Sequence, residues 1–129
     1  MKTAYEAGLE SRDATLIGAL ALMYLRHDDP ARALALGLAA MRSEPVSPRL
    51  ALLVGTAFLR TGDVEQALAV LSRFENGAEG LTPEPCQSTL QSVQILRAKA
   101  AYRQGRVDEA RALLEAALLE PGEGQGTLQ

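Results

Sequence analysis

The chain has few of the residues that carry chemistry. Its 129 residues include one histidine, one cysteine and no tryptophan. Because His27 and Cys86 stand alone in the sequence, a zinc site lacks its other ligands and an internal disulfide is excluded. A Cys–His nucleophile pair would require these two distant residues to meet in the fold. There is no glycine-rich phosphate loop either. We therefore expect no enzyme, no metal and no cofactor.

Long apolar runs are also missing. No run approaches the roughly 18–20 residues that span a bilayer, and the first residues, MKTAYEAGLESRD, have no signal-peptide core. Strand-favouring Val, Ile and Thr are scarce and do not alternate. The net charge is −3 and aromatic residues make up only 4%, which argues against nucleic-acid binding. We expect a cytoplasmic, helical protein that binds neither membrane nor nucleic acid.

What the chain does contain is an internal repeat. The segments 21–45, 55–79 and 98–122 align on one frame, with a turn at Asp28, Gly62 and Gly105 and a small residue at Ala33, Ala67 and Ala110. The successive turns are 34 and 43 residues apart, so nine residues are inserted between the second and third copies. A period in this range indicates a helical solenoid.

This pattern resembles the tetratricopeptide repeat, in which two antiparallel helices, A and B, form each unit. That family has small residues at positions 8 and 20, a large apolar or aromatic residue at 11, and Gly near 15. Position 8 here is Ala21, Gly55 and Ala98, and position 11 is Tyr24, Phe58 and Ala101. The closing proline, Pro45 in the first copy, is missing from the second. The resemblance implies an all-α fold of three tandem helix-turn-helix repeats in a short right-handed solenoid.

Six helices are expected, over residues 14–26, 30–42, 47–61, 63–74, 86–104 and 107–120. Asp13 is the expected N-cap of the first, and Pro30 suits the first turn of the second. Residues 1–13 form an N-terminal segment able to add a short helix. Residues 14–120 form the three-repeat domain, with a Gly- and Pro-containing loop inserted at 75–85, and residues 121–129 are expected to be a disordered tail.

The resemblance also implies a binding face, because helix A of this repeat lines the concave side through positions 2, 5, 9, 12 and 13. Five of the 13 basic residues fall at these positions and none of the 16 acids. Such a face suits a peptide or helix with apolar anchors and acidic flanks. Alternatively, a basic residue at position 13 is simply common in the repeat. The expected partner-binding residues are Leu22, Leu25, Arg26, Arg49, Leu52, Thr56, Leu59, Arg60, Ile95, Lys99, Tyr102 and Arg103.

Several functions suit such a module. Clamping the acidic C-terminus of heat-shock chaperones would need Lys and Asn where this chain has Gly18 and Leu22. Size, repeat number, charge and apolar groove are similar to those of the small tetratricopeptide chaperones of bacterial type III secretion, which hold a secreted subunit or co-chaperone. An assembly adaptor of another bacterial complex is the alternative. A third is a self-associating module, because Ala112, Ala116 and Leu119 lie on the open face of the last helix without a polar cap.

Overall fold

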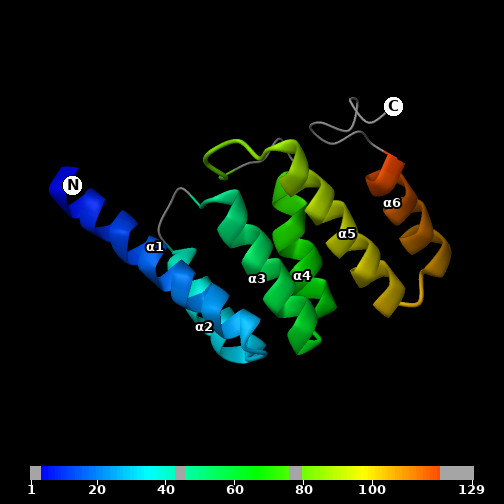
Figure 1. Ribbon diagram of the computed structural model, residues 1–129, viewed down its shortest axis with the longest axis horizontal. Helices are drawn as coiled ribbons and strands as arrows, with labels where there is room; N and C mark the ends of the chain where they lie inside the picture. The colour runs from blue at the N-terminus through cyan, green and yellow to red at the C-terminus, as the bar shows by residue number, and fades with distance from the viewer. Residues whose placement is uncertain (1–3, 43–45, 76–79, 120–129) are drawn as a thin grey trace.

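The computed structural model describes residues 4–42, 46–75 and 80–119 (Figure 1). Within these ranges the chain forms six α-helices, one short 3-10 helix and no strand. The helices are α1 (Ala4–Arg26), α2 (Pro30–Ala40), α3 (Pro48–Thr61), α4 (Val64–Leu71), η1 (Ser72–Phe74), α5 (Gln87–Arg103) and α6 (Val107–Leu119). The expected all-α fold is confirmed.

The helices are arranged as three successive antiparallel pairs, α1–α2, α3–α4 and α5–α6, as Figure 1 shows. Each pair packs on the next, because α2 contacts α3 and α4 contacts α5. The first helices of the pairs, α1, α3 and α5, are also neighbours. The molecule is therefore a helical-repeat solenoid in which each pair packs on the adjacent pairs.

The turn inside each pair has one conformation. Asp28, Gly62 and Gly105 occupy the same repeat position and have φ angles of 64°, 91° and 80°. This left-handed conformation ends the preceding helix and costs little for glycine. Asp29 and Asp63 then cap α2 and α4, since their Oδ1 atoms accept hydrogen bonds from the backbone N–H groups of Arg32 and Gln66.

The first helix differs from the expectation. It begins at Ala4 and runs through Asp13, so the prediction of Asp13 as an N-cap is wrong. Residues 4–13 continue α1 and do not form a separate helix. The physical reason is that this segment contains no proline and mostly strong helix formers, so nothing stops the helix before residue 14. The predicted tail at 121–129 lies outside the described residues.

The core consists of small residues inside the pairs and larger ones between them. Ala33 and Ala67 are fully buried and Ala110 is 7% exposed, so the helices of each pair approach closely. The main cluster joins α3, α4 and α5 through residues such as Leu71, Val93 and Leu96. This cluster fixes the second pair against the third.

The insert contributes to this core. Its Leu81 is 7% exposed and belongs to the main cluster, together with Val46. The two residues form an isolated parallel bridge, in which Val46 N–H donates to the Gly80 carbonyl (3.2 Å) and Thr82 N–H donates to the Val46 carbonyl (2.9 Å). In its described part, the predicted insert therefore includes a buried anchor.

Candidate protein-binding surface

The residues expected to bind a partner all lie on α1, α3 and α5, the three neighbouring first helices. The structure therefore brings together positions that are far apart in the sequence. Helices α3 and α5 contain no acidic residue, whereas α4 contains Glu65 and α6 contains Asp108, Glu109 and Glu115. In the second and third pairs the acidic residues therefore lie on the second helix, whereas in the first pair they lie on α1, at Glu6, Glu10 and Asp13, and α2 contains none.

Two of the expected apolar anchors are buried. Leu25 is 7% exposed and packs with Ala33 and Ala57, and Leu59 is 3% exposed within the main cluster. Neither side chain is open to a ligand, which corrects the expectation for these two residues. The physical reason is that each is covered by the next helix pair. Their role is to hold adjacent pairs together.

The arginines at one repeat position of the second and third pairs, Arg60 and Arg103, form equivalent hydrogen bonds to the carbonyl groups of these leucines. Arg60 Nη1 on α3 donates to the Leu25 carbonyl near the C-terminus of α1, at 2.9 Å. Arg103 Nη1 on α5 donates to the Leu59 carbonyl near the C-terminus of α3. A cation there also offsets the negative end of the helix dipole. These bonds give Arg60 and Arg103 a structural role, which agrees with the alternative that a basic residue at this position says little about the ligand.

The rest of the face is partly open. Leu22 and Tyr102 are exposed, Tyr102 at 66%, while Leu52 and Ile95 are half-buried. The Thr56 hydroxyl donates to the Leu52 carbonyl at 2.8 Å, so this donor is already used within α3. Three exposed cations form no hydrogen bond or ion pair with the described residues: Arg26, Arg49 and Lys99.

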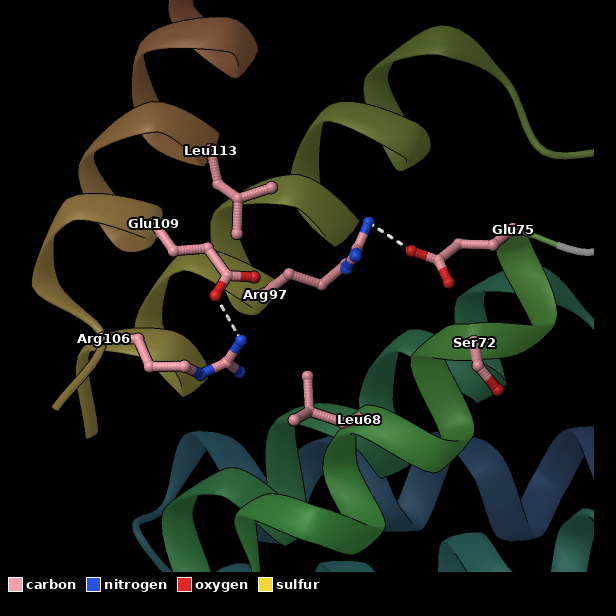
Figure 2. A pocket seen from close by; sticks show the side chains of 7 residues that line it. All are labelled: Leu68, Ser72, Glu75, Arg97, Arg106, Glu109 and Leu113. Carbon is pink, nitrogen blue, oxygen red and sulfur yellow. Dashed lines mark hydrogen bonds and ion pairs between the residues drawn. The ribbon is translucent and has the colours of Figure 1, made fainter. Parts of the chain in front are cut away.

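A small cleft between α4, α5 and α6 was not predicted (Figure 2). Its volume is about 190 Å³. Arg97 Nη1 lies 2.5 Å from Glu75 Oε1, and Arg106 pairs with Glu109. Figure 2 shows the Arg97 and Glu75 side chains extending toward each other across the cleft. Because its charges pair with each other, the cleft offers no free charge to a ligand. Its lining residues are Leu68, Ser72, Glu75, Arg97, Arg106, Glu109 and Leu113.

Cys86 and His27 do not form a pair. Cys86 precedes α5, and its Sγ lies 3.1 Å from Ser88 Oγ and 3.2 Å from Thr89 Oγ1. These hydrogen bonds, chiefly that with Ser88, lower the pKa of the Cys86 thiol to about 7. His27 follows the C-terminus of α1, at the opposite end of the layer of first helices. Within the described ranges, no group of three or more His, Cys, Asp or Glu residues could hold a metal ion.

Comparisons with known proteins agree with the repeat geometry. Two models of the tetratricopeptide repeat match the chain, over residues 18–80 and residues 91–116. No curated protein and no solved structure matches it. Among the described helices, none has the length and apolar character to cross a membrane. The matched ranges contain the left-handed turn residue of each helix pair, namely Asp28, Gly62 and Gly105.

Proposed function

Because the chain belongs to the tetratricopeptide-repeat proteins, which are protein-interaction modules, we propose that it holds a segment of a partner protein against α1, α3 and α5. The segment is an extended or helical peptide with apolar anchors and acidic flanks. The observation that carries this proposal is the surface itself. Exposed Leu22 on α1 and Tyr102 on α5 lie in the layer of first helices, which also carries Arg26, Arg49 and Lys99, three cations without an ion pair among the described residues.

The apolar and charged groups have different parts in this proposal. Leu22, Tyr102 and the open parts of Leu52 and Ile95 supply contact area, and burying a large apolar side chain contributes about 1.5–3 kcal/mol. Exposed ion pairs contribute roughly 0–1 kcal/mol each. The cations therefore select the sign of the partner's charge and speed its association more than they strengthen its binding.

We propose two cellular roles for this binding surface. A chaperone for a subunit or co-chaperone of bacterial type III secretion suits the size and charge of the chain, and an assembly adaptor of another bacterial complex suits the same surface. Both place the protein in the cytoplasm. The comparisons match repeats alone, so they do not favour one role over the other. Self-association is a further possibility for the same module, supported by the exposed Leu118 and Leu119 side chains of the last helix.

A random peptide library displayed on phage tests the proposed surface without knowledge of the partner. We expect the parent protein to select peptides that combine Asp or Glu with spaced large apolar residues. The variant Arg49→Glu with Lys99→Glu reverses the charge of two exposed groups on α3 and α5, and it should bind those peptides about tenfold more weakly and select basic ones.

The matched control reverses two exposed arginines away from the first helices, Arg42→Glu with Arg111→Glu. This variant should select the same acidic peptides as the parent. The proposal is wrong if the α3–α5 variant and the parent yield one consensus, or if the control changes the consensus equally. Leu59→Asp is unsuitable as a test, because it places a charge in the core.

A further inference from the structure

We propose that copies of this protein stack head to tail, with α1 of one copy packing on α5 and α6 of the next and continuing the repeat. This surface shares Arg26 and Tyr102 with the proposed peptide-binding face, but it is formed mainly by the two ends of the solenoid. Each end shows one half of an interface that the molecule already forms twice internally.

The first half is an apolar stripe on α1. On α3, the residues that pack toward the preceding pair are Leu50, Leu53, Val54 and Ala57, and Val54 and Ala57 are fully buried. The equivalent residues of α1 in the repeat frame are Leu16, Ala19, Leu20 and Met23. Leu16 is 62% exposed, Leu20 41% and Met23 55%. The stripe has the composition of a buried junction, and no helix pair among the described residues covers it.

The second half lies on the last pair. In the first pair, Leu25 is buried by α3, the Gly37 backbone lies against Val54, and Met41 packs on the main cluster. The equivalents in the last pair are Tyr102, Leu114 and Leu118, with exposures of 66%, 41% and 63%. They would receive the next repeat, and the described chain has no further pair after α6.

The hydrogen bonds of Arg60 and Arg103 indicate that a second copy of this chain fits between the two ends. Leu25 and Leu59 carbonyls each accept two hydrogen bonds, one from the turn residue behind them and one from the arginine of the next pair. The Tyr102 carbonyl accepts from the Gly105 N–H, at 3.0 Å, but from no arginine among the described residues. Arg26 is the equivalent arginine of the first pair and has no described partner. The Tyr102 carbonyl in the last pair thus lacks an arginine donor, and Arg26 in the first pair lacks a carbonyl acceptor, among the described residues.

A second copy supplies both the apolar surface and the hydrogen bond in the register that the fold already uses. The two patches differ, so the contact is heterologous and does not close into a symmetric dimer. Each added copy leaves one of each end free. Assemblies should therefore grow with concentration beyond two copies.

Sedimentation of single-end variants tests this arrangement. Leu20→Glu blocks the α1 end and Leu118→Glu blocks the α6 end, and both sites are exposed, so the fold should be retained. We expect the parent to show an average mass that rises past the dimer with concentration. Each variant alone should stop at a monomer. An equimolar mixture of the two should form a one-to-one dimer, since each variant keeps the end that the other has lost.

Other outcomes would overturn the proposal. A parent that stays monomeric at the highest soluble concentration excludes stacking. A Leu20→Glu variant that still dimerises, while Leu118→Glu does not, shows instead a symmetric contact through α6. If circular dichroism shows that Leu20→Glu is misfolded, Leu16→Glu replaces it. Arg26→Ala should weaken self-association roughly three- to tenfold, whereas Arg42→Ala, an exposed arginine outside the stripe, should leave it unchanged.

Discussion

The two internal junctions of the solenoid use the same repeat positions in different ways. In the first junction, between α2 and α3, Gly37 faces Val54 so closely that a Cβ atom on Gly37 would lie 2.7 Å from Val54 Cγ2. In the second, between α4 and α5, these positions are Leu71 and Arg97. Glycine permits the close approach at the first junction, whereas the Leu71 side chain lies against Gly55 of its own pair and fills space in the main cluster.

The wider second junction has other means of stabilisation. Arg97 is too polar to replace Val54 in a dry contact, so its guanidinium lies in the cleft and pairs with Glu75. Leu81 from the insert enters the core cluster that contains Leu71. The same repeat frame therefore accommodates two kinds of junction. One is close and contains a small residue, Gly37, and the other is more open and is filled in part by Leu81 of the insert.

The largest effect that the comparison predicts is at Leu71. This side chain is 1% exposed and belongs to the main cluster, so Leu71→Ala should lower the free energy of unfolding by about 2–5 kcal/mol. Urea unfolding followed by circular dichroism measures this. Leu38→Ala, at an exposed position of α2, is the control and should change little. Equal losses from both variants would mean that Leu71 does not hold the second junction.

The reverse change belongs to the first junction. Gly37→Leu gives it the residue found at the second junction, but here the side chain meets Val54, which is fully buried. We expect a loss of about 1–3 kcal/mol from overpacking, even though leucine favours helix more than glycine does. Ala39→Leu, exposed on the same helix, is the matched control. If thermal melting shows Gly37→Leu to be as stable as the parent, the first junction is not closely packed.

A smaller effect is expected from the ion pair of the second junction. The Arg97 and Glu75 side chains are 27% and 46% exposed, so solvent screens their attraction. A double-mutant cycle with Arg97→Ala and Glu75→Ala should give a coupling of about 0.2–1 kcal/mol, decreasing with added salt. A coupling that salt leaves unchanged would argue against an ion pair in the cleft.

The smallest effect concerns the caps that begin the two helices after the junctions. Ser47 Oγ accepts from the Leu50 N–H and caps α3, whereas the Cys86 side chain at the start of α5 bonds to the side chains of Ser88 and Thr89. Its thiol pKa of about 7 predicts that the rate of alkylation by iodoacetamide is half-maximal near pH 7. Ser88→Ala with Thr89→Val removes the hydroxyls and should move this midpoint upward.

The lowered pKa of the Cys86 thiol also sets the direction in which pH affects the stability of the fold. The folded protein favours the thiolate, so any stabilisation is fully present above the pKa of the unfolded thiol and is lost as the pH falls through about 7. An alkylation midpoint that stays the same in the double variant would show that Ser88 and Thr89 do not lower the pKa.

Local rules predicted the repeat well. The turns at Asp28, Gly62 and Gly105 and the buried alanines at 33, 67 and 110 follow from the backbone conformation and the helix spacing that these residues permit. Contacts between pairs were harder to predict. Leu25 and Leu59 were assigned to an open face, because repeat position alone does not show how far the next pair covers it.

The insert was the other difficulty. Its glycines and prolines predicted a loop, and that composition gave no indication that Leu81 would be buried. Leu81 packs beside Val46, which is 35 residues earlier in the chain. Such a contact between distant residues depends on how the helix pairs pack on one another, and a local sequence pattern does not show this. The starting residue of α1 was also missed, because a capping residue such as Asp13 does not end a helix whose neighbours favour helix.

The bridge between Val46 and Leu81 has a consequence for how the molecule unfolds. In a simple linear array the pairs open one after another from the ends, because each contributes a separate unit of stability. Here the segments that enter and leave the α3–α4 pair are hydrogen-bonded to each other, one on either side of it. Loosening one boundary of the middle pair therefore disturbs the other, so the second and third pairs should melt as one cooperative block while α1 and α2 are free to fray.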